Sequence, residues 1–270
     1  MAVVQTLWEH SDFQGFSRTR STDSFRYRWD KWGGGDNDVF SSMRAWGMGH
    51  RGNAYAFEHI NFDGRFAALN VGAGGSSWWS YFGDALNDKV SSSLIVARAP
   101  QAAETEVALR QQVASRFASL FDAETAGTQL SRRGDPRVYG TFFPDSDPTR
   151  KFATINQDLN VAINNWPDYD ANVRYDIEFY LSNAGHLQGY ARWSHVWVES
   201  GIFHDTVIDN IAPRLHAAKS KITSAIQAQL AVFSTSVFSA VYLLPGPVPD
   251  MNQFGFFANH DDDLILVVVS

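Results

Sequence analysis

The chain has 270 residues, of which 44% are hydrophobic and 19% charged, a balance typical of globular and not of disordered proteins. The absence of cysteine excludes disulfides and thiolate metal sites. The net charge of −7 comes from the C-terminal part, because residues 1–100 carry ten basic and ten acidic side chains whereas residues 101–270 carry 12 and 19. This acidic excess argues against nucleic acid as a partner, since a phosphate backbone selects a basic face.

The sequence gives no sign of a membrane span or of a secretory signal. A transmembrane helix needs about eighteen or more consecutive apolar residues, and no such run exists. Met1–Trp8 lacks the basic start of a signal peptide, and its apolar run is too short. We therefore expect a soluble protein, either cytoplasmic or secreted without a visible signal peptide.

Two short sequence signatures occur twice in the first hundred residues. Trp8–Gly15 aligns with Phe57–Gly64 at an offset of 49, and Asn37–Ser42 aligns with Asn87–Ser92 at an offset of 50. Their recurrence in the same order, at nearly one period, indicates a duplicated unit of about fifty residues.

The duplicated unit predicts β-structure. Gly15 and Gly64 each follow an aromatic residue in a tight-hairpin context, where a positive φ is easy only for glycine. The basic and aromatic stretch 26–32 predicts an exposed strand, with a patch that binds nucleic acid or sugar as the alternative. Short apolar runs predict further strands at residues 3–8, 43–46, 54–57 and 94–97.

The composition changes near residue 100, and the rest of the chain predicts both helices and strands. Apolar residues at helical spacing predict helices over residues 102–122 and 206–233, where Pro213 indicates a kink or a start. Alternation predicts a hairpin with strands 173–181 and 187–198, and further strands are expected at 153–164, 237–244 and 264–269. We expect two domains: residues 1–99, all β, and residues 100–270, α+β with an antiparallel sheet and a long amphipathic helix.

The duplicated unit resembles the βγ-crystallin superfamily. The Greek-key motif of that family has an aromatic, four residues, an aromatic, one residue and a glycine, which Trp8–Gly15 and Phe57–Gly64 both match. Calcium-binding members also carry Asn/Asp-Asn/Asp-x-x-Ser/Thr-Ser, matched at Asn37–Ser42 and Asn87–Ser92. The resemblance covers residues 3–98 and implies a double Greek-key sandwich that binds two Ca²⁺ ions.

The resemblance also implies a ligand set in which each site takes oxygens from both motifs. Ca²⁺ takes six to eight oxygen ligands, and because few full charges enter each site we expect a Kd of about 10⁻⁶–10⁻⁴ M. The division of the ligands between the sites stays open. The alternative is that these loops bind no metal, since Asx and Ser residues also cap turns. The expected ligands are the side chains of Asp38, Ser41, Asp88 and Ser91 and the backbone oxygens of Glu9, Val39, Glu58 and Lys89.

Other candidate sites are weaker. His186, His195 and His204 lie nine residues apart, which favours separate surface histidines over a metal site. His260–Asp263 favours a solvated turn over a cation site. Asp145–Asp147 and Glu199–His204 contain Ser, His and acidic residues without the context of a catalytic triad, and the common nucleophile, zinc and nucleotide motifs are absent.

The leading hypothesis from the sequence is a non-enzymatic calcium-binding protein. Its second domain would recognise an unknown protein, glycan or lipid partner. One alternative is a secreted toxin or surface-binding protein that is targeted to glycans or membranes. Another is an enzyme or a lipid carrier with its site in the C-terminal domain. In an enzyme, His195, Glu199 or His204 would line a polar pocket, whereas in a lipid carrier a long helix and a curved sheet would enclose the lipid.

Overall fold

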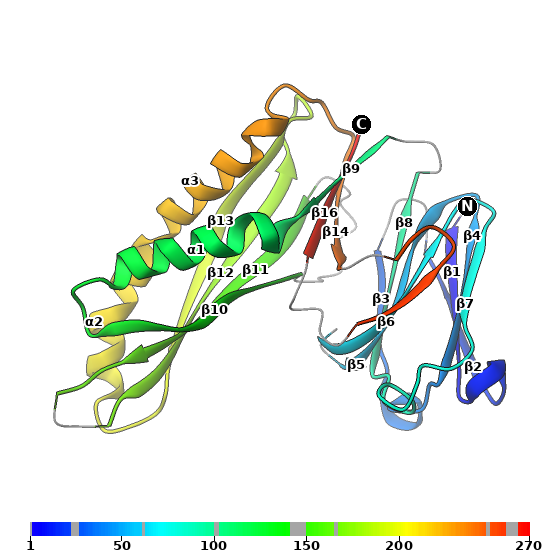
Figure 1. Ribbon diagram of the computed structural model, residues 1–270, viewed down its shortest axis with the longest axis horizontal. Helices are drawn as coiled ribbons and strands as arrows, with labels where there is room; N and C mark the ends of the chain where they lie inside the picture. Colours follow the sequence, from blue (N-terminus) through cyan, green and yellow to red (C-terminus); the bar gives the residue numbers. More distant parts are fainter. Residues whose placement is uncertain are drawn as a thin grey trace. The chain divides into compact units, whose positions relative to one another are not determined.

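A computed structural model describes residues 2–22, 27–60, 63–99, 103–140, 150–164, 167–246, 249–257 and 264–270. The protein is mostly β, with four antiparallel sheets, and it forms two compact units (Figure 1). The first unit comprises Met1–Glu104, Phe142–Pro148 and Leu244–Asp261, and the second comprises Thr105–Thr141, Thr149–Leu243 and Asp262–Ser270.

The first unit contains two of the sheets, which share one hydrophobic core. One sheet has the order β2-β1-β4-β7, with β1 at Ala2–Trp8, β2 at Ser17–Ser21, β4 at Ser42–Met48 and β7 at Ser76–Trp79. The other has the order β15-β6-β5-β8-β3, with β3 at Tyr27–Lys31, β5 at Arg51–His59, β6 at Asp63–Val71, β8 at Ser92–Arg98 and β15 at Phe254–Phe257. The strands predicted from the apolar runs are confirmed. Large buried core members include Leu7, Phe40, Met43, Leu69, Phe82 and Ile95.

The two halves of the repeat exchange their third strands. In the first half the strands are β1 to β4, and in the second half they are β5 to β8. β3 pairs with β8 of the second half, and β7 pairs with β4 of the first half. Neither half therefore completes its sheet alone, and the loops that follow β3 and β7 are brought to the opposite half.

A segment from near the end of the chain completes one edge of the first unit. β15 runs antiparallel to β6, with Phe254 opposite Leu69. Asn252 Oδ1 also accepts a hydrogen bond of 2.9 Å from the Gly72 amide. The sequence prediction placed all of residues 100–270 in the second domain, and this four-residue strand was too short to be predicted from periodicity.

The second unit is built on the antiparallel meander β10-β11-β12-β13. These strands are Leu130–Gly140, Arg150–Val161, Tyr169–Leu181 and Leu187–Val198. The predicted hairpin is confirmed, and Gly185 in its turn has φ +78°. One face of this sheet is covered by α1 (Leu109–Thr125), α2 (His204–Ala217) and α3 (Lys219–Leu230), as Figure 1 shows, and a third sheet adds β14 (Ala240–Pro245), β16 (Leu264–Val269) and β9 (Glu104–Ala108).

The helices differ from the sequence prediction in two respects. The segment predicted as the first turns of a helix from residue 102 forms β9, because pairing in the third sheet overrides a weak helical propensity. The long helix is divided at Ala218 into α2 and α3, and the short helix η3 (Ala231–Phe233) follows α3. Pro213 lies inside α2 and does not start it. The apolar stripe is confirmed, since its residues are buried against the sheet: Val207, Ile211, Leu215, Ala218, Ile222, Ile226 and Leu230.

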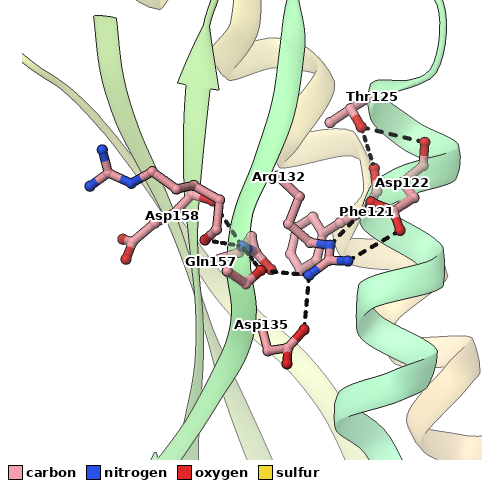
Figure 2. A network of polar contacts seen from close by, with 9 residues as sticks. Phe121, Asp122, Thr125, Arg132, Asp135, Gln157 and Asp158 are labelled. Atoms are coloured by element: carbon pink, nitrogen blue, oxygen red, sulfur yellow. Dashed lines mark hydrogen bonds and ion pairs between the residues drawn. The ribbon is translucent and has the colours of Figure 1, made fainter.

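A polar network fixes the edge strand β10 to α1 and β11. Figure 2 shows Arg132 reaching Asp122 of α1 at 3.1 Å and Asp135 at 3.1 Å. The hydrogen bond to Asp122 raises the pKa of Arg132. The buried Gln157 of β11 donates to the backbone oxygens of Arg133 and Gly134, at 3.2 and 3.3 Å, where the β10–β11 register shifts. The sequence prediction left this polar segment without a strand, because its bulge interrupts the alternation.

Candidate metal centre

Each half of the repeat begins with a hairpin that uses a glutamate side chain internally. Gly15 and Gly64 have φ +76° and +79°, and a Cβ at Gly15 would lie 2.8 Å from the Glu9 carboxylate. Glu9 Oε2 accepts the amide of Phe16 at 3.2 Å, and Glu58 Oε2 accepts the amide of Arg65 at 3.2 Å. The carboxylates are thus engaged within their own hairpins, which leaves the backbone oxygens as the groups that could bind a metal.

The two Asn-Asp loops have the same irregular backbone. Asp38 and Asp88 have φ +57° and +53°, a left-handed conformation that Asp and Asn adopt more readily than other side chains. Asn37 donates to Asp38 Oδ2 at 2.5 Å, and Asn87 donates to Asp88 Oδ2 at 2.8 Å. In each loop the asparagine therefore orients the carboxylate, whose other oxygen turns toward the opposite half of the repeat.

The two loops meet through a reciprocal exchange of contacts. Ser41 Oγ lies 2.9 Å from Asp88 Oδ1, and Ser91 Oγ lies 2.7 Å from Asp38 Oδ1. Ser41 Oγ is also 2.7 Å from the Glu9 backbone oxygen, and Ser91 Oγ is 3.5 Å from that of Lys89. We call the oxygens of Glu9, Ser41 and Asp88 cluster A, and those of Asp38, Lys89 and Ser91 cluster B.

The spacing within cluster A suits a hard cation. Oxygens that ligate one Ca²⁺ at about 2.3–2.6 Å, six to eight at a time, lie roughly 3 Å from their neighbours. The contacts of 2.7 and 2.9 Å have this size. The Ser41 hydroxyl has one proton for two acceptors, so a hydrogen bond accounts fully for only one of the two contacts.

Two buried aromatic residues hold the loops through hydrogen bonds of their backbone amides. The Trp32 amide donates to the Ser91 backbone oxygen, and the Phe82 amide donates to that of Ser41, both at 2.9 Å. Trp32 and Phe82 each stand six positions before the loop aspartate, an aromatic match that the sequence comparison of the two halves could have found. Because they follow the exchanged strands, they tie each loop to the opposite half.

A shallow concavity of about 770 Å³ lies over cluster B, lined by residues that include Trp32, Asp38, Glu58 and Ser91. Trp32 is 3% exposed, and its Nε1 has no hydrogen-bond partner among the described residues. The Lys89 ammonium lies 3.4 Å from the backbone oxygens of Asp84 and Ala85. It is therefore held by these carbonyls, while the Lys89 carbonyl belongs to cluster B.

The structure brings together most of the ligands predicted from the sequence. Six of the eight supply oxygens to the clusters, whereas the backbone oxygens of Val39 and Glu58 are not among the contacts that define them. In the part of the chain that the structure describes, no group of three or more His, Asp or Glu side chains could hold a metal. Each cluster has one carboxylate and otherwise uses hydroxyl and carbonyl oxygens.

The weaker candidate sites do not assemble. His186 contacts the Ser236 backbone oxygen, His195 contacts Asp176, and His204 contacts Asp205, so each has different surroundings. Glu199 contacts the Asp170 amide at 3.4 Å. Residues 145–147 and 260–263 lie outside the described residues. The apolar cavity between Phe117, Ile177 and Leu230 measures about 20 Å³, which is room for about one water and not for a lipid chain.

Comparison of the chain with protein-family models, with curated proteins and with solved structures finds no match in any of the three. None of the helices within the described ranges is both long enough and apolar enough to cross a bilayer.

Proposed function

We propose that the first unit is a βγ-crystallin-type domain of two Greek-key motifs that binds two Ca²⁺ ions, one at cluster A and one at cluster B. The observation that carries this proposal is the reciprocal pairing of Asp88 with Ser41 and of Asp38 with Ser91. Two oxygen clusters, each with a left-handed aspartate and a serine from the opposite half, are what a duplicated oxygen-ligand site requires.

The proposal assigns the ligands across the halves. Cluster A takes its carboxylate from the second half and its hydroxyl and carbonyl from the first, while cluster B takes its carboxylate from the first half. Each site has one full negative charge, which supports the expected affinity of about 10⁻⁶–10⁻⁴ M. The second unit, an α+β domain, would then supply recognition, and calcium would act as a structural stabiliser of the first.

Titration calorimetry of the full chain with Ca²⁺ tests both the sites and their assignment. We expect two bound ions for the parent chain and one for Asp38→Asn or Asp88→Asn. Asparagine tolerates the left-handed backbone, so the substitution removes charge with little strain. Asp36→Asn is the matched control, because Asp36 is an acidic neighbour paired with Arg18 at 2.7 Å and should leave both sites intact.

Double variants separate the exchanged assignment from ligation within one half. If the ligands are exchanged, D38N combined with Ser91→Ala damages one site only and retains one ion. D38N combined with Ser41→Ala damages both sites and retains none. Ligation within each half predicts the opposite stoichiometries, and no heat from the parent chain at millimolar Ca²⁺ would refute calcium binding altogether.

A further inference from the structure

The sheet of the second unit has a face that its three helices do not cover. Along β12, the side chains of Val173, Tyr175 and Ile177 are buried in the core with the helices. The alternate positions therefore point to the opposite face, which we call the open face. It is polar, yet it carries two of the most exposed tryptophans among the residues that the structure describes, Trp193 at 44% and Trp197 at 57%.

A β-bulge places these tryptophans on the open face. The register between β12 and β13 pairs Ile177 with Ala191 but Asp176 with Trp193, so Arg192 is an extra residue. Without the extra residue, strict alternation would turn Trp193 and Trp197 into the core together with Ala191. Bulges often re-aim side chains at functional sites, and this one turns two large rings outward. His195 lies between them on the same side and is also exposed.

The Trp193 ring is held in place by its neighbours. Phe152 stacks on Trp193 with ring centroids 5.6 Å apart, and the Arg192 guanidinium lies 4.7 Å from the centre of the Trp193 ring. Glu178 fixes Arg192 through a contact of 2.7 Å. Such preorganisation lowers the conformational entropy that the protein side chains lose when a ligand binds.

The charges of the open face are balanced by internal pairs. Arg174 and His195 both contact Asp176, at 2.8 and 3.3 Å. Arg192 contacts Glu178, and two further arginines whose side chains the structure describes pair with aspartates: Arg133 with Asp170 and Arg137 with Asp158. Because the cations described on this face are already paired with carboxylates, they do not favour phosphate or other anions, but its planar amide, carboxylate and guanidinium groups can exchange hydrogen bonds with hydroxyl groups.

We propose that the open face binds an uncharged oligosaccharide that lies along β13, with one sugar ring stacked on Trp197 and another packed against Trp193. The two residues are four positions apart on one strand, roughly 13 Å, which is the length of about three sugar rings in an extended chain. His195 and the groups around Asp176 lie between the two aromatic platforms, where the hydroxyls of a bound chain would meet them. This site is independent of the calcium clusters.

Calorimetry with the full chain and three neutral probes, namely cellotetraose, chitotetraose and maltotetraose, tests the proposal. We expect at least one to bind with a Kd of about 1 mM or tighter. Trp197→Ala and Trp193→Ala should each weaken that binding roughly tenfold through the lost ring contact. Trp78→Ala, at a 56% exposed tryptophan of the first unit, is the matched control and should bind as the parent does.

The same titrations are repeated with chelator, so that loss of calcium binding and loss of sugar binding are read separately. Circular dichroism confirms that each variant is folded, and Trp197→Ala is the more informative variant because its ring is largely exposed. No binding of any of the three probes at about ten times the expected Kd overturns the proposal. So does binding that both tryptophan variants leave unchanged, or tighter binding of an anionic heparin tetrasaccharide than of the neutral probes.

Discussion

Replacement of Gly15 by alanine tests how the first hairpin supports cluster A. The left-handed backbone at φ +76° costs an alanine about 1–2 kcal/mol. The new Cβ would also lie 2.8 Å from Glu9 Oε2, so the carboxylate must move and give up its hydrogen bond to Phe16, at about 1 kcal/mol more. We expect Gly15→Ala to lower the free energy of unfolding by about 2–3 kcal/mol.

The matched control for this variant is Gly74→Ala. Gly74 has φ +77° but nothing within 4 Å of its would-be Cβ, so it should show the backbone cost alone. Urea unfolding with chelator measures both variants, and a Ca²⁺ titration of Gly15→Ala should show one weakened ion, because the Glu9 carbonyl belongs to cluster A. Equal destabilisation by the two variants would refute the steric argument.

Three further substitutions test other parts of the molecule. Burial lowers the pKa of His50 below 6.5, so the unfolded chain takes up a proton that the folded chain does not. The free energy of unfolding should therefore fall as the pH drops below about 6.5. His50→Gln should flatten this dependence, as measured by urea titrations at pH 7.5 and 5.5. Gln157→Leu removes the hydrogen bonds of a buried side chain to the bulge carbonyls of Arg133 and Gly134 and should cost about 1–3 kcal/mol in urea unfolding. Gln188→Leu, at a half-buried side chain on the open face, should cost less. Tyr175→Phe removes a hydrogen bond of 2.6 Å to the Leu215 carbonyl and should lower the free energy of unfolding by about 1–2 kcal/mol. Because burial raises the pKa of Tyr175, its phenol should stay protonated at pH 10, which an ultraviolet titration of the parent and the variant measures.

The sequence predicted local structure better than it predicted pairing. Alternation and turn residues located the hairpin of β12 and β13, and the repeat placed Asp38 and Asp88 in equivalent loops, both of which are left-handed. The exchange of β3 and β7 between the halves is a matter of long-range pairing, which no local pattern specifies. This exchange decides which serine meets which aspartate.

The same limit explains why the open face was not predicted. The alternation of β13 changes phase at Arg192, where a bulge inserts one extra residue. Trp193 and Trp197 therefore have the spacing of core residues in the sequence but are exposed in the structure. His195 and Trp197 share one face, whereas Glu199 lies beyond the end of the strand.

The exchanged ligands have a consequence for how calcium would stabilise the first unit. The paired residues are 47 positions apart in cluster A and 53 apart in cluster B, so an ion in either cluster joins both halves of the repeat. Neither half alone can assemble a site, and the free energy of binding therefore counts toward folding of the whole unit. At a free Ca²⁺ concentration of a hundred times Kd, each ion adds about 2.7 kcal/mol to the free energy of unfolding, so two ions add roughly 5 kcal/mol. This sum is comparable with the lower end of the stability of ordinary domains, about 5–15 kcal/mol. Calcium should thus raise the melting temperature of the first unit, which should still melt in a single transition. In D38N, the increase in melting temperature should be about half as large. Separate calcium-dependent transitions for the two halves would show that the ligands are not exchanged.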